Sequence, residues 1–348
     1  MPENPTPRQI AKQILQGGAP PRPLLAPIVF ALGAKIENLP LPAFLENPTK
    51  ISNALRHIRP RLRSDGVTCY FDPLLEVEAL GATLAWQSND KPPAIHWPQP
   101  ARRGELPAGL RSPEDAAKAN RVQIALEVIR RMAATRRDDS LLFAAVSGPG
   151  TLAARLTQLT DEPDLRFETL PSGALDLAAA TITQLATAFV EAGANLVFIQ
   201  EDFLPALSAS AAKSWSSLLS PLINIIRFYE AVPALQITSA VAFHRNSDAI
   251  LSQSWECVLC APLDALQQCA ARISDSAASI PLGAALPPEA FHPAQAENSA
   301  VSASAAAPFR DILSTSGGAL LGRFHPVLLT TSADSSAAPA NQIRSIPE

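Results

Sequence analysis

Several features that mark common classes of protein are scarce in this sequence. Four cysteines in 348 residues are too few for a disulfide framework, so we expect them to be reduced. The net charge is −4 at pH 7, and the lack of a basic face argues against a nucleic-acid partner. No apolar run is expected to cross a membrane, and the N-terminus lacks a signal-peptide pattern. These absences predict a cytoplasmic protein with no nucleic-acid or membrane partner.

Hydrophobic residues, by contrast, make up 47% of the chain, and its 33 prolines fall mostly between apolar segments. Short apolar segments rich in β-branched residues alternate with amphipathic helical segments. Eight strands are expected, over residues 24–32, 67–71, 141–146, 196–199, 239–243, 255–259, 280–285 and 326–330. Eight strands that are each followed by a helix predict an α/β fold, a (β/α)₈ TIM barrel formed by residues 1–348 as a single domain.

Three segments are predicted to lie outside this alternation. Residues 1–23 form an N-terminal extension, with a helix that begins after Thr6. Residues 87–111 are a proline-rich excursion, interpreted as a hairpin, which precedes a helix that begins at Ser112. Residues 294–307 are a low-complexity segment of alanine and serine.

Polar residues that end or follow strands are the main candidates for a functional site. Asp72 follows the second predicted strand, Glu201 and Asp202 follow the fourth, and His244 and Cys260 follow the fifth and sixth. The carboxyl ends of barrel strands face one another, so these side chains are expected to meet. A simpler interpretation of Asp72 is a helix cap, which an Asp-Pro pair often provides.

Four segments resemble, in the same order, segments of the uroporphyrinogen decarboxylase superfamily. They are GVTCYFDPLLEVEALGATLAW at 66–86, VSGPGTLAARL at 146–156, GANLVFIQEDFLPAL at 193–207 and AVAFHRNSDAI at 240–250. The superfamily contains decarboxylases and corrinoid-dependent methyltransferases. The resemblance implies a TIM-barrel enzyme that acts on a small molecule, with a corrinoid protein or a second copy in a homodimer as a candidate partner.

The methyltransferases of this superfamily hold zinc with a His-x-Cys motif and a second, late cysteine. His244 resembles the zinc-binding histidine, but Arg245-Asn246 follows it, and the late position falls at Ser332-Ala333. Cys260 is the remaining candidate thiolate, although Cys257 and Cys260 are more simply interpreted as core residues. The resemblance thus implies a zinc site at His244 and Cys260 in which both of the family's cysteines are missing.

The decarboxylases of the superfamily bind their substrate with an arginine-bearing loop after the first strand. The corresponding segment here, ALGAK at 31–35, keeps Lys35 as its cation. The resemblance places Arg155, or its neighbour, where the family has a tyrosine and Asp202 where it has a serine, and Asp72 matches the family's aspartate. A substrate with many carboxylates is therefore not expected, because recognising them needs bidentate arginine pairs.

Three hypotheses follow. The first is a methyltransferase that moves a methyl group between a corrinoid or similar carrier and a small acceptor. The second is a metal-independent decarboxylase or lyase that uses Asp72 and His244 on a small carboxylated or heterocyclic substrate. The third is a non-catalytic binding barrel, which is disfavoured because unpaired buried acids are costly. The candidate catalytic residues are Asp72, His244, Glu201 and Asp202, and the candidate substrate-binding residues are Asn246, Arg155 and Lys35.

Overall fold

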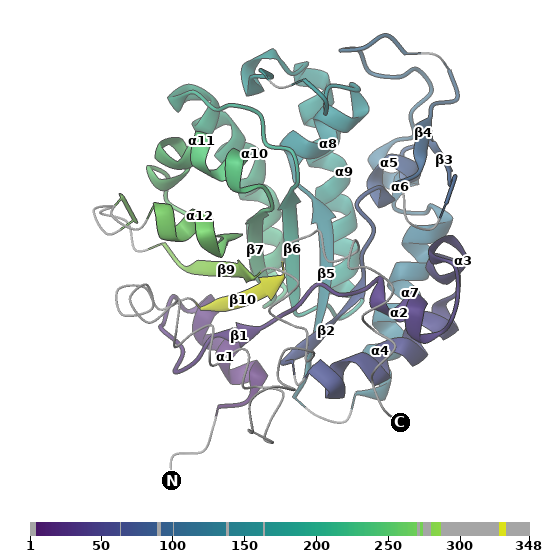
Figure 1. The fold of residues 1–348 in the computed structure, drawn as a ribbon, viewed down its shortest axis with the longest axis vertical. Helices are drawn as coiled ribbons and strands as arrows, with labels where there is room; N and C mark the ends of the chain where they lie inside the picture. The colour runs from purple at the N-terminus through teal and green to yellow at the C-terminus, as the bar shows by residue number, and fades with distance from the viewer. Residues whose placement is uncertain are drawn as a thin grey trace, which may run out of the picture.

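The computed structural model of the chain describes residues 5–62, 64–88, 92–99, 101–136, 139–162, 164–269, 272–273, 280–286 and 327–331. Within them, eight parallel strands form a nearly closed barrel (Figure 1). The strands are β1 (Leu24–Leu25), β2 (Gly66–Tyr70), β5 (Leu141–Ser147), β6 (Leu196–Glu201), β7 (Val232–Ile237), β8 (Val258–Pro262), β9 (Leu282–Leu286) and β10 (Leu328–Thr331). Their order is β1-β10-β9-β8-β7-β6-β5-β2. The predicted (β/α)₈ barrel is confirmed.

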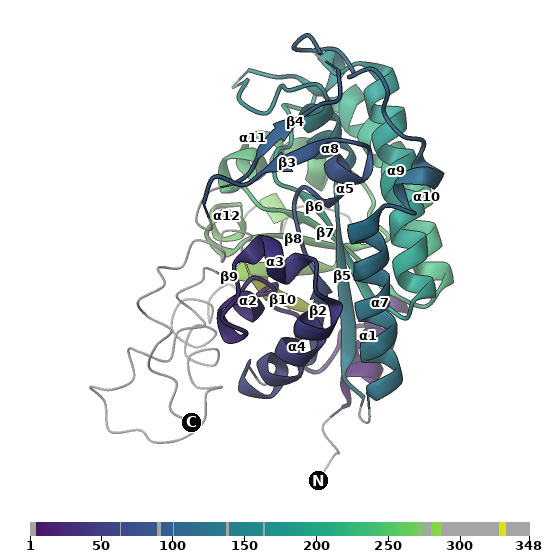
Figure 2. The same ribbon diagram turned by 90° about the vertical axis from the view of Figure 1, so that its right-hand side faces the viewer.

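Helices pack around the outside of the barrel and connect its strands (Figures 1 and 2). They are α2 (Leu32–Ile36), α3 (Leu41–Leu45), α4 (Pro48–Leu62), α5 (Leu75–Ala79), α6 (Pro113–Ala116), α7 (Asn120–Thr135), α8 (Pro149–Leu156), α9 (Ser172–Glu191), α10 (Ala209–Phe228), α11 (Ala240–Leu251) and α12 (Leu263–Gln268). Because these helices cover one face of the sheet and the interior fills the other, β6 and β7 are buried along their whole length.

The N-terminal extension closes the amino-terminal end of the barrel with α1 (Pro7–Leu15). Thr6 and Gln9 form a capping box, in which each side chain accepts a hydrogen bond from the other residue's backbone N–H. The buried residues Ile10 and Ile14 pack into the apolar cluster of the barrel interior. The extension is therefore part of the core.

Alternation along the strands divides the core into two parts. On β6, Leu196 and Phe198 belong to the interior cluster, whereas Val197 and Ile199 pack against the surrounding helices. This follows from the two-residue period of a strand. The same period decides, for each polar residue at a strand end, whether its side chain reaches the barrel axis or the helices.

Side chains close the gap between β1 and β2, which stand at the two ends of the strand order. Arg22 donates to both oxygens of Asp65, at 2.7 and 2.8 Å. Asp65 Oδ2 also accepts from the Leu25 N–H at 2.8 Å, and Thr68 Oγ1 donates to the Pro27 carbonyl at 3.1 Å. Bidentate arginine–carboxylate pairs are among the stronger hydrogen-bonded contacts. These side-chain contacts form a seam between β1 and β2, two strands that do not pair with each other.

The strand expected over 239–243 is wrong. Ser239 is the N-cap of α11, since its side chain accepts from the Ala242 N–H at 3.2 Å, and the fifth barrel strand is β7, just before it. Pro233 obscured β7, because proline lacks the N–H that a central strand normally donates. The correction moves His244 from a strand end into a helix.

Other boundaries also differ from the expected ones. The first strand covers Leu24–Leu25 rather than 24–32, and the helix expected from Ser112 is divided into α6 and α7. The hairpin expected within 87–111 begins earlier, since β3 (Thr83–Ala85) is antiparallel to β4 (Ala94–His96). Residues 294–307 lie outside the described part of the chain.

The helix α9 corrects the expectation that no apolar run is long enough to cross a membrane. Among the described helices it alone has the length and composition for a span, yet 44% of its most apolar window is buried inside the protein. It packs against α8, α10 and β5 on the outside of the barrel (Figure 2). We therefore interpret α9 as a core helix of the fold.

Candidate functional site

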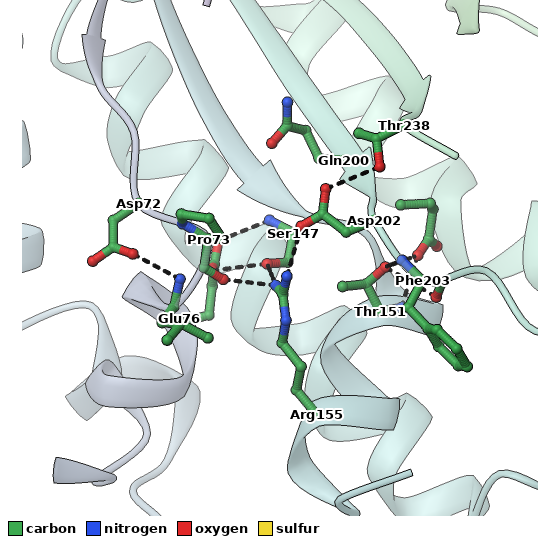
Figure 3. Close-up of polar contacts among 12 residues, drawn as sticks. Asp72, Pro73, Glu76, Ser147, Thr151, Arg155, Gln200, Asp202, Phe203 and Thr238 are labelled. Carbon is green, nitrogen blue, oxygen red and sulfur yellow. Dashed lines mark hydrogen bonds and ion pairs between the residues drawn. The ribbon is translucent and has the colours of Figure 1, made fainter. Parts of the chain in front are cut away.

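Arg155, on α8, links the carboxyl ends of four strands (Figure 3). Its Nη2 lies 2.6 Å from Asp202 Oδ2, and its Nη1 donates to Ser147 Oγ at 3.0 Å and to the Pro73 carbonyl at 2.6 Å. Thr238 Oγ1 in turn donates to Asp202 Oδ1 at 3.3 Å. The side chains of Arg155 and Asp202 are 12% and 23% exposed, so the pair remains within reach of solvent at the barrel mouth.

Glu76, a buried residue of α5, fixes the orientation of this arginine through Ser147. Its Oε1 accepts from the Ser147 N–H at 2.8 Å and its Oε2 accepts from Ser147 Oγ at 3.0 Å. Because the serine gives its proton to Glu76, its lone pairs are left to accept from Arg155. Burial raises the pKa of Glu76. Glu76 is therefore a positioning residue behind the Arg155–Asp202 pair.

Glu201 points away from the barrel axis and supports the start of α8. Its Oε1 accepts from Gly150 N at 3.1 Å and Trp215 Nε1 at 2.8 Å, and its Oε2 accepts from Thr151 N and Oγ1, both at 2.7 Å. A Cβ on Gly148 would lie 2.2 Å from Glu201 Cδ, so the glycine makes room for the carboxylate. Burial raises the pKa of Glu201. Its contacts hold the N-terminus of α8 and join it to Trp215 of α10, so the structure gives it a structural role.

Asp72 is also occupied by neighbours rather than free at the barrel mouth. Its Oδ1 accepts from the N–H of Leu74, two residues further along the chain, at 2.9 Å, and its Oδ2 forms an ion pair with the buried Arg121. Arg121 also contacts Glu78 at 2.8 Å and donates to Tyr70 at 3.2 Å. The N-cap of α5 is Leu74, and no side chain caps that helix, so the structure does not give Asp72 the capping role.

The residues proposed for zinc do not come together. His244 lies on α11, where its Nδ1 is 3.5 Å from Cys269 Sγ, and Cys260 lies within β8 in the apolar barrel interior. Burial raises the pKa of the Cys260 thiol well above its ordinary value, which disfavours the thiolate that zinc needs. Cys257 packs on the helix side of the same strand, so the two cysteines are core residues on opposite faces, as the simpler interpretation has it.

The end of the fifth barrel strand, where a zinc-binding histidine was expected, carries other residues. Because the fifth barrel strand is β7, the residues at its end are Gln236, Ile237 and Thr238. Gln236 Oε1 accepts from Gln200 Nε2 at 3.2 Å, and Gln236 Nε2 donates to the Thr331 carbonyl at 2.8 Å. Among the described residues no three His, Cys, Asp or Glu side chains gather to hold a metal. The donors present do not fit zinc.

Two further predicted residues lie away from the Arg155 network. Asn246, on α11, is buried and holds the segment that follows β6: its Oδ1 accepts from the Leu207 N–H at 2.8 Å, and its Nδ2 donates to the Pro205 carbonyl at 3.1 Å. Lys35 is an exposed residue of α2, a helix that packs on α3 and α4. Neither residue contacts Arg155 or Asp202.

The structure also adds residues to the site that were not predicted. Four of them, Glu76, Ser147, Gln200 and Thr238, are labelled in Figure 3, and the fifth, Gln236, accepts a hydrogen bond from Gln200. Ser147 and Gln200 are each the last or next-to-last residue of a strand. Placing every strand end correctly would have found them. Glu76 had no such signal, because its role depends on its hydrogen bonds to Ser147, which lies 71 residues further along the chain.

Comparisons with known proteins agree with this architecture. A family model described as uroporphyrinogen decarboxylase (URO-D) matches residues 6–261. A methyltransferase from Methanosarcina mazei has a TM-score of 0.65 at 18% identity, over 94% of this chain and 92% of that chain. A phosphonopyruvate hydrolase reaches 0.42 at 11% identity, over 95% and 82%, and a homocysteine methyltransferase from Escherichia coli 0.40 at 13%, over 94% and 98%. The last two scores are too low to bear on function, and no curated protein sequence matches the chain.

Proposed function

This chain belongs to the uroporphyrinogen decarboxylase family, and from that premise we propose that it is a metal-independent carboxy-lyase acting on a small carboxylated substrate. The observation that supports the proposal is the Arg155–Asp202 pair, at 2.6 Å and partly exposed where the carboxyl ends of the strands converge. An arginine at this position suits a carboxylate, because the guanidinium matches its geometry. One such arginine suits a substrate with few carboxylates.

The two residues have separate roles in the proposed reaction. Arg155 binds the substrate anion and thereby releases Asp202, which is then free to relay a proton from water. When the bond to the carboxyl carbon breaks, CO₂ leaves and the electron pair stays on the remaining carbon beside the guanidinium. Asp202 delivers its proton to that carbon and takes another from water. Thr238, at 3.3 Å, holds Asp202 in place, and Ser147, at 3.0 Å, holds Arg155.

The first test measures the binding of a panel of small mono- and dicarboxylates by ligand-observed NMR. We expect at least one to bind, and Arg155→Gln to weaken its affinity about tenfold or more. Arg8→Gln is the matched control, since Arg8 is half-exposed and 4.0 Å from its partner Asp139. Release of labelled CO₂ from the bound carboxylate then tests the reaction. Equal affinity of the wild type and Arg155→Gln would overturn the proposed role of Arg155.

Methyl transfer is the second candidate, and the similarity to the Methanosarcina mazei methyltransferase over 94% of the chain favours it. Here Asp202 would take a proton from a small acceptor, and a corrinoid or similar carrier would supply the methyl group. Because the donors do not fit zinc, this version has no metal-bound thiolate. The visible spectrum of methylcobalamin reports whether it loses its methyl group. Loss of that group in the presence of the protein and a candidate acceptor would favour this function over the lyase.

The expected partners also remain proposals. A corrinoid protein belongs to the methyltransferase hypothesis and is tested by co-purification. A homodimer is proposed from the family resemblance, and sedimentation of the purified chain at several concentrations tests it.

A further inference from the structure

His244 and Cys269 lie together where α11 packs against α12. The Nδ1 of His244 is 3.5 Å from the Sγ of Cys269. Cys269 is 3% exposed and belongs to the core on the helix side of the barrel, whereas His244 is half-buried. Within the part of the chain that the structure describes, neither side chain has another hydrogen-bond partner, and His244 Nε2 is buried without one. The thiol and the imidazole are therefore paired with each other.

This pair has the composition of an activated thiol. An imidazole nitrogen can accept the proton of a thiol, and the thiolate that forms is the nucleophile. No other group among the described residues holds the His244 ring in one tautomer, so its Nδ1 is available to accept the proton of Cys269. The distance between the two atoms allows this transfer without any movement of the backbone.

The other three cysteines have no imidazole beside them among the described residues. The Sγ of Cys69 lies 3.8 Å from the Val67 carbonyl, which does not take the thiol proton. Burial raises the pKa of Cys69 and of Cys257 to about 12, and it raises that of Cys260 well above its ordinary value. These three thiols therefore stay protonated near neutral pH and serve as internal references for Cys269.

We infer that His244 and Cys269 form a reactive thiol site, at which hydrogen peroxide oxidises Cys269 to a sulfenic acid. The imidazole takes the thiol proton, and the thiolate sulfur attacks one oxygen of the peroxide. The S–O bond forms as the O–O bond breaks, and the hydroxide that leaves takes the proton from the imidazolium to become water. The sulfur is oxidised and the peroxide is reduced. Because α12 has only six residues, its local opening gives this small reagent access to the thiol.

Dimedone labelling of the whole protein tests the inference, because dimedone reacts with sulfenic acids and mass spectrometry locates the product. After a brief treatment with hydrogen peroxide, we expect Cys269 to carry at least about tenfold more label than each of the other three cysteines. The urea-unfolded chain gives the reference labelling of each thiol. His244→Gln should lower the labelling of Cys269 about tenfold, because the amide does not take the thiol proton. His57→Gln, at an exposed histidine of α4, is the matched control and should leave the labelling unchanged.

Two results would overturn the inference. The first is equal labelling of the four cysteines in the folded wild type. The second is equal or stronger labelling of Cys269 in a His244→Gln protein that melts with the wild type. If that variant unfolds, the comparison of the four wild-type thiols decides alone. None of these measurements uses a carboxylate, so they are independent of the role proposed for Arg155.

The reactive thiol site is also connected to the segment that follows Asp202. Asn246, two residues after His244 on α11, accepts from the Leu207 N–H at 2.8 Å. An oxygen added to Cys269 needs space between α11 and α12, so oxidation should shift α11 and weaken this hydrogen bond. Hydrogen exchange of the Leu207 amide should then become faster in the peroxide-treated wild type and not in Cys269→Ser. Equal exchange before and after treatment of the wild type would overturn this connection.

Discussion

The two sides of β6 show how adjacent acids acquire different roles. Glu201, on the helix side, is fully buried and accepts four hydrogen bonds at the start of α8 and from α10. Asp202, the next residue, lies on the axis side, where its side chain is 23% exposed beside Arg155. The chemistry of the two side chains is almost the same. The side of the strand determines that one carboxylate supports the fold and the other is available to a ligand.

The largest expected effect is on stability and concerns the helix side. Glu201→Ala should lower the free energy of unfolding by about 4 kcal/mol, because buried donors of Gly150, Thr151 and Trp215 lose their acceptor. Asp202→Ala should cost about 1 kcal/mol, since its ion pair is partly exposed. Urea unfolding of both variants measures the difference. Equal losses would contradict the division between the two sides.

Catalytic activity, unlike stability, should depend on Asp202 on the axis side of the strand. Asp202→Asn should lower kcat about 100-fold for the carboxylate identified by the binding panel, because the amide does not carry the proton. Its melting temperature should stay within a few degrees of the wild type, as the amide keeps an acceptor for Thr238. If Asp202→Asn kept full activity, Asp202 would not be the proton donor of the proposed mechanism.

A third acid, Asp65, lies at the seam between β1 and β2, and its effect on stability can be compared with those of Glu201 and Asp202. Asp65→Ala should cost about 2 kcal/mol, because it removes the acceptor for Arg22 and for the Leu25 N–H where two strands do not pair. Asp139→Ala is the control, since its exposed contact with Arg8 at 4.0 Å should contribute less than about 0.5 kcal/mol. Chemical denaturation compares them. A similar small loss in both would mean that the seam is held by packing alone.

The smallest effect is a pH dependence that sharpens the role of Glu76. Burial raises its pKa above the ordinary 4.5, so the folded protein holds a proton that the unfolded chain has already released. Stability therefore falls as pH rises from 4.5 through the folded pKa, with a slope of at most about 1.4 kcal/mol per pH unit. Glu76→Gln should remove this contribution. Unfolding curves at several pH values measure the difference, and parallel curves for the two proteins would contradict it.

The barrel itself was predictable because its signals are local. Apolar strands such as Leu141–Ser147 and Leu196–Glu201 stand out from their polar surroundings, and helices begin at caps such as Thr6. The error at 239–243 arose where a local signal misleads: Pro233 interrupts the pattern of β7, while AVAF in α11 looks like a strand. That single error placed His244 at the barrel mouth and hid Gln236 and Thr238.

The sequence by itself determined the fold class, the helix caps and the presence of acids at the ends of strands, because these depend on neighbours within a few residues. Tertiary structure alone decided which acid lies within reach of solvent and of a ligand. Asp72 meets Arg121 from α7, Glu201 meets Trp215 from α10, and Asp202 meets Arg155. A carboxylate's role depends on the partners and the solvent that surround it. Residues far apart in the chain supply those partners, so only the folded barrel could assign the roles.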